Sequence, residues 1–338
     1  MRDNRIDILR FIGLAMVIFA HVGPPRFLFQ LRNFDVPLMV LVSGMSFGLS
    51  YKNDVAYLTY IWKRVKRVVF PVWIFLMVYF SVLFLFFPDN SELEANIIFS
   101  SFSLIGGIGY VWIIRVFFLV ALVSPFIYLY NKKIESHYHY LLSLTIFFAV
   151  YELVRYFSVL DIEGGVGTVV NLVIPYVVPY SILFALGLRI PSLNKRQMIN
   201  VSIFNLGLFI VLGAILFLIF GEFKPTQALK YPPSTYYFSY SIFVSCILWG
   251  FSLSIEKILK KVKLLQVVLF IAQNSIWIYL WHIPLVKIPH TNFVLKYVIV
   301  FSISVAIVYC QVWLVNNVLI NLTSSVAARK NMKILLTG

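Results

Sequence analysis

The fold is decided by an apolar stretch near the N-terminus with the sequence RIDILRFIGLAMVIFAH, residues 5–21. Ten uncharged residues separate Arg10 from His21. On a helix, eleven steps of about 100° return to within roughly 20° of the starting direction and rise about 16 Å. Arg10 and His21 are therefore predicted to share one face of a membrane helix.

Ionisable side chains on this helix point to function, because they are costly in lipid and are expected to face protein or a water-filled cavity. A second interpretation stays open, in which Arg10 is a positive anchor at one membrane boundary and His21 a hydrogen-bonded histidine at the other. Asp7 precedes Arg10 by three residues. It is placed either to pair with Arg10 or to be a solvated acid in the first turn.

The composition is that of a polytopic membrane protein: of 338 residues, 61% are hydrophobic and 12% charged, and the mean hydropathy is +0.91. We expect a single all-α membrane domain over residues 1–338, with about ten transmembrane helices. The predicted spans are 8–23, 35–51, 68–88, 107–130, 140–157, 169–188, 200–220, 237–255, 265–286 and 293–321. The fourth stays open, because the glycines at 106, 107 and 109 also suit a re-entrant or interfacial piece before the helix proper. No small-residue cleavage site follows the first span, so it is expected to stay in the mature protein.

The net charge of +15 is interpreted through membrane topology, since nothing resembles a nucleic-acid module. Lys and Arg concentrate in alternate segments, such as 63–67 and 257–263, which lie inside if the N-terminus is inside. Both termini are therefore expected in the cytoplasm. Cys246 and Cys310 fall within spans, and no residues have metal-ligand spacing, so neither a disulfide nor a metal site is expected.

Further basic residues are candidates for binding or catalysis. Arg64 and Arg67 are spaced to share a helix face, either as cytoplasmic anchors or as ligands for the phosphates of a diphosphate-bearing cofactor. Arg115 lies well inside a span, so it is expected to pair with Glu152, either structurally or in a site. Arg155 follows Glu152 by three residues.

Two outer regions carry polar and aromatic side chains. His282 lies near the outer end of its span, where a membrane histidine is often a packed hydrogen-bonding residue. The outer loop 224–237, which contains Lys230 and Tyr231, is rich in proline and tyrosine. Its rings and hydroxyls suit a sugar, although tyrosine belts are also ordinary at membrane interfaces.

These pieces form an ordered series of motifs. They are Arg10-x10-His21, the sequence VPLMVLVSG at 36–44, Lys63-Arg64-x2-Arg67-x3-Pro71, Trp112-x2-Arg115, Lys230-Tyr231-Pro232-Pro233, and SIWIYLWHIPL at 275–285. In this order they resemble the integral membrane acyltransferase-3 family, whose members O-acylate glycans and related acceptors with acyl-CoA. Met39 stands where that family usually has a bulky aromatic residue, and Ile113 where it has phenylalanine. No hydrolase-like domain follows the last span, so the chain resembles the stand-alone members.

The resemblance implies a membrane O-acetyltransferase in the inner membrane of a bacterium. It would move an acetyl group from acetyl-CoA to a sugar hydroxyl of a cell-surface glycan, such as exopolysaccharide, capsule or lipopolysaccharide O-antigen, or of a lipid-linked precursor. His21 is expected to act as general base, with Arg10 and Arg115 as further catalytic residues. Arg10, Arg64 and Arg67 are expected to bind the donor phosphates. The residues expected to bind the acceptor are Asp35, Glu152, Lys230, Tyr231 and His282.

Direct transfer is favoured over an acyl-enzyme on Ser43 or His21. Membrane lipids are expected as partners, whereas a metal and nucleic acid are not. A polytopic transporter or flippase for a glycan or small molecule is the alternative function. The oligomeric state and the acceptor hydroxyl stay open.

Overall fold

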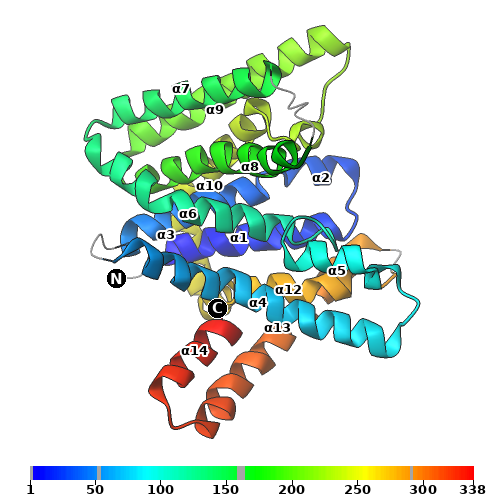
Figure 1. Cartoon of the computed structure of the whole chain (residues 1–338). Coiled ribbons are helices and arrows are strands. Elements are labelled where there is room, and N and C mark those ends of the chain that lie inside the picture. Colours follow the sequence, from blue (N-terminus) through cyan, green and yellow to red (C-terminus); the bar gives the residue numbers. More distant parts are fainter. Residues whose placement is uncertain (1–2, 52–54, 158–163, 290–291) are drawn as a thin grey trace. The chain divides into compact units, whose positions relative to one another are not determined.

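The computed structural model describes residues 3–51, 55–157, 164–289 and 292–338, which are mainly helical and contain no strand (Figure 1). The predicted all-α class is therefore confirmed. The chain divides into two compact units. Unit 1 contains residues 1–17, 25–53 and 122–266, and unit 2 contains residues 18–24, 54–121 and 267–338.

Most helices belong to one unit, whereas three contribute residues to both: α1 (Asn4–His21), α6 (Trp112–Lys133) and α11 (Leu265–Gln273). Unit 1 also holds α2 (Arg26–Leu31), α3 (Asp35–Ser50), α7 (His137–Phe157), α8 (Gly164–Arg189), η2 (Ile190–Ser192), α9 (Lys195–Phe220), η3 (Thr226–Leu229) and α10 (Thr235–Lys261). Unit 2 holds α4 (Tyr57–Phe86), η1 (Ser91–Leu93), α5 (Ala95–Phe102), most of α11 (Leu265–Gln273), α12 (Ser275–Val286), α13 (Phe293–Asn317), η4 (Leu319–Leu322) and α14 (Val326–Leu336).

In unit 1, two glycines let the backbones of α3 and α8 approach closely. A Cβ added at Gly44 would lie 2.2 Å from the carbonyl oxygen of Phe184, and one added at Gly187 would lie 2.2 Å from that of Leu41. Close approach through small residues is a main source of helix association in membranes, where the hydrophobic effect between helices is absent. These glycines therefore fix how α3 packs on α8.

The helices of unit 1 that flank the loop 224–237 have well-defined ends. Asn194 caps α9, because its side chain accepts from Gln197 N while the Gln197 side chain accepts from Asn194 N. Gly221 ends α9 in the left-handed conformation, with φ 71°. Ser234 then accepts from Tyr237 N at the start of α10. The loop between the helices is thereby fixed at both ends.

In unit 2, α12 packs against α4 and α13. Helix α14 also packs against α4 and α13. Trp277 Nε1 of α12 donates to the carbonyl of Leu335 at 3.1 Å. On α13, Gln311 Nε2 donates to the carbonyl of Leu336 at 2.6 Å and Gln311 Oε1 accepts from Trp281 Nε1 at 2.8 Å. The last turn of α14 is thus hydrogen-bonded to α12 and α13.

One predicted span differs in the structure, because residues 265–286 form two helices bent by 82° instead of one. Asn274 stands at the break and its side chain donates to the carbonyl of Phe270. The second helix, α12, therefore starts anew at Ser275, directly after the polar residues Gln273 and Asn274.

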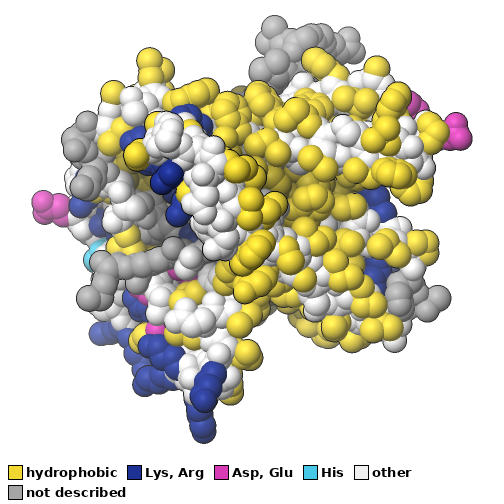
Figure 2. All heavy atoms as spheres, turned by 90° about the horizontal axis from the view of Figure 1, so that it is seen from below, with side chains coloured by type: hydrophobic (Ala, Val, Ile, Leu, Met, Phe, Trp, Pro, Cys, Tyr) yellow, Lys and Arg dark blue, Asp and Glu magenta, His cyan; other side chains and the backbone are white. Residues whose placement is uncertain are grey.

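Among the described residues, seven helices are long and apolar enough to cross a membrane, or up to eight if the bent pair is one span. The protein is therefore a multi-pass membrane protein, but the predicted number of ten is not confirmed. The predicted spans 8–23 and 140–157 form the helices α1 and α7, which are not among the seven. Hydrophobic side chains cover much of the face in Figure 2, as lipid-facing helices require. The cytoplasmic location of both termini stays a prediction.

Candidate active site

The two histidines expected in the site, His21 and His282, lie together in unit 2. His21 is the last residue of α1 and His282 lies in α12. His21 Nδ1 is 2.9 Å from His282 Nε2, and the rings stack with centroids 5.1 Å apart. His282 is fully buried and its Nδ1 faces the carbonyl oxygen of Tyr279 one turn earlier. The pair is a hydrogen-bonded dyad that joins helices far apart in sequence.

Tyr110 completes this centre. Its ring meets His21 edge-on with centroids 4.9 Å apart, and it meets His282 at 5.9 Å. Tyr279 Oη donates to the carbonyl of Tyr110 at 2.6 Å. Tyr110 was not among the predicted site residues, although the glycines that precede it are a usable signal of a turn.

Those glycines shape the turn that leads to Tyr110. Gly107 has φ +63°, and a Cβ there would lie 1.9 Å from Ser101 Oγ, which accepts from Ile108 N. Only glycine fits this position without a shift in the turn. The predicted span 107–130 therefore starts later in the structure: residues before Trp112 form this turn, a separate piece that the glycines had left open, and α6 begins at Trp112.

Arg115 supports the same turn from α6. It is 9% exposed, and its Nη1 donates to the carbonyl of Ile105 at 2.8 Å. Glu152 instead pairs with Arg155 on α7, so its expected pairing with Arg115 is not the arrangement found. A guanidinium facing a carbonyl five residues before Tyr110 stabilises the backbone of the turn.

A polar cluster follows His282 at the end of α12. Lys287 Nζ donates to both carboxylate oxygens of Glu92 and to Tyr79 Oη, and Tyr79 Oη donates to Glu92. This cluster ties the end of α12 to α4 and to η1. Burial raises the pKa of Tyr110, and the negative charge of Glu92 raises it further. The carboxylate of this cluster therefore acts electrostatically on Tyr110.

Arg64 and Arg67 lie one turn apart on α4 of unit 2. Arg64 Nε donates to Tyr60 Oη at 3.1 Å, and Tyr60 Oη donates to the carbonyl of Ala121 at 3.0 Å. Arg67 is exposed, with the like charge of Arg64 close by. An anion held by both groups would relieve their repulsion.

Arg10 is held in unit 1. Its Nη1 donates to Asp7 Oδ1 at 2.6 Å, and its Nη2 donates to Ser46 Oγ of α3 at 2.7 Å. The pairing of Asp7 with Arg10 is therefore confirmed, and Asp7 is buried. Met39 packs beside this helix, because a Cβ on Gly13 would lie 2.7 Å from Met39 Cγ. Met39 is smaller than an aromatic residue and thus fits the close contact of α1 with α3.

Two of the residues expected to bind the acceptor form a buried ion cluster in unit 1. Asp35 Oδ2 accepts from Arg32 Nη1 at 2.8 Å, and Asp35 Oδ1 lies 3.7 Å from Lys230 Nζ. All three side chains are buried. Burial lowers the pKa of Lys230, and the charge of Asp35 opposes that effect. The cluster anchors the loop 224–237 to α3.

Glu152 on α7 contacts the loop 224–237, which carries Tyr231. Glu152 Oε2 accepts from Thr235 N at 2.7 Å and from Thr235 Oγ1 at 2.8 Å, so it caps the start of α10. Next to Glu152, Tyr151 Oη donates to the carbonyl of Pro233 at 2.8 Å. Tyr231 is 46% exposed, and Lys230 Nζ lies 5.7 Å from the centroid of its ring.

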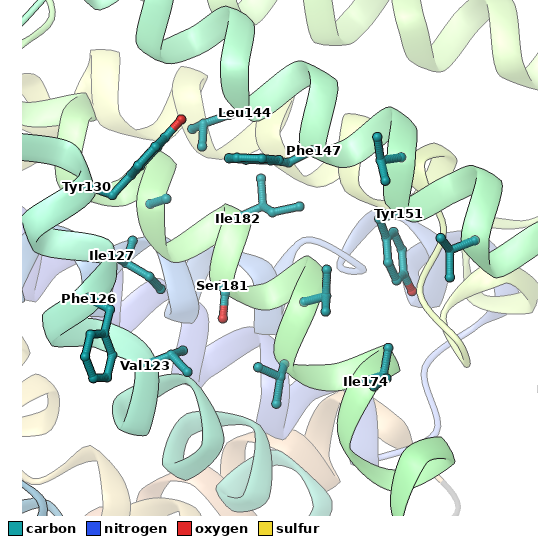
Figure 3. A pocket seen from close by; sticks show the side chains of 15 residues that line it. Val123, Phe126, Ile127, Tyr130, Leu144, Phe147, Tyr151, Ile174, Ser181 and Ile182 are labelled. Atoms are coloured by element: carbon teal, nitrogen blue, oxygen red, sulfur yellow. The ribbon is translucent and has the colours of Figure 1, made fainter. Parts of the chain in front are cut away.

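A separate pocket of about 570 Å³ opens between α6, α7 and α8 of unit 1 (Figure 3). Its walls are aliphatic and aromatic except for the polar atoms of Tyr130, Tyr151 and Ser181. Such a lining suits a hydrocarbon chain and does not suit the phosphates of a nucleotide or a sugar.

The family comparison agrees with this geometry. A family model described as an acyltransferase domain, acyltransferase-3, matches residues 3–316. The chain therefore belongs to the acyltransferase-3 family and is a membrane acyltransferase. No curated protein and no solved structure matches the chain. No group of three or more metal-ligating side chains occurs in the described ranges.

Proposed function

We propose that this acyltransferase moves an acetyl group from acetyl-CoA to a sugar hydroxyl of a cell-surface glycan or its lipid-linked precursor. The observation that supports it best is the dyad of His21 and His282 beside Tyr110. A histidine is suited to general-base catalysis because imidazole titrates near physiological pH. The protein is proposed to act in the inner membrane of a bacterium.

In the proposed reaction, His21 takes the proton from the acceptor hydroxyl. The hydroxyl oxygen then forms a bond to the thioester carbonyl carbon, the C–S bond breaks, and the leaving thiolate takes the proton from His21. The products are the acetyl ester and free CoA, so atoms and charge balance. Arg115 acts on the Tyr110 turn in this scheme, which makes it a positioning residue.

Arg64 and Arg67 are proposed to hold the phosphates of the donor. Arginine suits phosphate because its planar donors bind two oxygens at once. The support is their spacing on α4 and the exposure of Arg67. A phosphate role for Arg10 stays a separate prediction, since its guanidinium is held by Asp7 and Ser46.

The acceptor residues are proposed with different roles. Tyr231 is partly exposed and suited to stack on a sugar ring. Asp35, Lys230 and Glu152 hold the loop that carries it. The apolar pocket is proposed to take a hydrocarbon chain of a membrane lipid, which agrees with the expected lipid partners.

Mass spectrometry of surface glycans tests the function. Deletion of the gene should remove one acetyl group per modified sugar, and complementation with the wild-type gene should restore it, whereas His21→Ala should not. Purified protein in proteoliposomes should also transfer radiolabel from acetyl-CoA to glycan from the deletion strain. A glycan of unchanged mass would contradict the proposal, and movement of unmodified glycan would identify a transporter.

A further inference from the structure

The protonation of His282 follows from its neighbour on α12. Its Nδ1 faces the main-chain oxygen of Tyr279. A carbonyl oxygen can only accept a hydrogen bond, so Nδ1 must carry the proton. A neutral imidazole has one N–H group, and the remaining nitrogen, Nε2, then has a lone pair.

The neutral state of His282 is set by its surroundings. The side chain is 0% exposed, and in the described parts of the chain no carboxylate forms an ion pair with it. Its ring nitrogens meet a carbonyl and another histidine, and its ring faces Tyr110 and Tyr279. An unpaired cation in such a site would be very costly, so the neutral form is favoured.

The tautomer of His21 follows in turn. His282 Nε2 accepts, so the hydrogen bond of 2.9 Å to His21 Nδ1 must be donated by His21. The proton of neutral His21 is therefore on Nδ1, and the lone pair is on Nε2. This is the nitrogen that a general base needs.

We propose that His282 is a positioning residue, which selects the Nδ1–H tautomer of His21 and directs the lone pair of His21 Nε2 to the acceptor hydroxyl. This inference rests on the proposed function. Because His282 is fully buried, it acts through His21 and not by contact with the acceptor. It has the place that a carboxylate has behind the histidine of a catalytic triad.

The dyad also contributes during proton transfer. When His21 Nε2 takes the hydroxyl proton, His21 becomes a cation and its bond to His282 becomes charge-assisted. That bond is stronger in the transition state than in the ground state, so it accelerates the step. The proton then leaves from His21 Nε2 to the CoA thiolate, and His282 stays neutral throughout.

The test compares two replacements of His282 in the full-length protein. His282→Gln places an amide oxygen near the position of Nε2 and can accept from His21, whereas His282→Leu cannot. We expect His282→Leu to lower kcat about 10- to 100-fold, the effect of one charge-assisted hydrogen bond. His282→Gln should recover most of this loss, and both variants should leave the KM for acetyl-CoA unchanged. The assay is transfer of radiolabel from acetyl-CoA to glycan of the deletion strain.

A double variant separates positioning from a structural effect. In the His21→Ala background, His282→Leu should lower the residual rate no further, because its partner is already missing. His139→Leu, on α7 of unit 1, is the control for histidine loss outside the dyad.

Equal activity of the Leu and Gln variants, or an additive loss in the double variant, would overturn the role of His282 while leaving the function intact. If the wild-type protein transfers no label, the proposed function fails instead.

Discussion

Tyr279 lies one turn before His282 on α12 and donates its hydroxyl to the carbonyl of Tyr110 at 2.6 Å. The same residue offers its own carbonyl to His282 Nδ1. One residue of α12 therefore sets both the ring state of His282 and the position of the Tyr110 turn.

Replacing Tyr279 by phenylalanine tests this connection, because it removes the hydroxyl and keeps the carbonyl. We expect the free energy of unfolding to fall by about 1 kcal/mol, the net value of one hydrogen bond. The loss of kcat should exceed that of Tyr309→Phe, whose exposed side chain lies on α13. Thermal unfolding in detergent and the radiolabel assay measure the two effects, and equal rates for both variants would contradict it.

The glycines before Tyr110 provide a graded test of the turn. Gly107→Ala should lower kcat strongly, because its Cβ would meet Ser101 Oγ at 1.9 Å and φ is +63°. At Gly109 a Cβ would meet no atom within 4 Å, but φ is +81°. Gly109→Ala should therefore destabilise the turn only by backbone strain, about 1–2 kcal/mol, and lower kcat less than Gly107→Ala. Gly106→Ala has neither problem and should be nearly neutral. A different order of activities would exclude this account of the turn.

The donor role of the α4 arginines is tested by neutral replacements. Arg64→Gln and Arg67→Gln should each raise the KM for acetyl-CoA about tenfold, as expected for one lost charge-assisted contact. The value of kcat should change little, because the phosphates are remote from the reacting carbon. Lys63→Gln removes a charge on the same helix and is the matched control. Steady-state kinetics at fixed ionic strength measure KM and kcat for the three variants. An effect on kcat alone would argue against phosphate binding.

The glycines between α3 and α8 should matter for stability. Gly44→Ala and Gly187→Ala should each lower the free energy of unfolding by about 1–3 kcal/mol, because each Cβ would overlap a backbone carbonyl. Gly207→Ala on α9 has nothing within 4 Å and should be neutral or stabilising by up to about 1 kcal/mol. Thermal unfolding of the three variants in one detergent makes the comparison. A loss of equal size in Gly207→Ala would show that packing is not the cause.

Replacements of the buried charged residues of unit 1 should lower the free energy of unfolding by unequal amounts. Asp35→Asn removes the buried carboxylate that pairs with Arg32 and lies beside Lys230, so it should cost about 3–5 kcal/mol of unfolding free energy. Lys230→Met leaves Asp35 paired with Arg32 and should cost less. Chemical unfolding in detergent measures both, and a larger loss for Lys230→Met would contradict the ion cluster.

The sequence predicts local features of this protein better than its long-range contacts. Spacing along one helix predicted the pairing of Asp7 with Arg10, which the structure confirms. Period and apolar length located most of the helices. By contrast, 261 positions separate His21 from His282, and no pattern within either helix indicates their contact.

Two further features of the structure could not be predicted from the sequence, for physical reasons. The break at Asn274 lies among three uncharged polar residues, 273–275, within an otherwise mostly apolar stretch, so the stretch looks like one span. Glu152 has two basic candidates, Arg115 and Arg155, and only the three-dimensional structure identifies Arg155 as its partner. The roles of the site residues stay predictions until the variants are assayed.

The hydrogen bonds of the last turn of α14 bear on how the protein should be engineered. The family match ends at residue 316, but Trp277 and Gln311 donate to the carbonyls of Leu335 and Leu336. Trp277 lies on the same short helix as His282. An expression clone that ends at residue 316 would lack these acceptors, and the helix that carries His282 would lose the hydrogen bond of Trp277. An affinity tag at this end needs a spacer, so that the last turn of α14 keeps its contacts with α12 and α13.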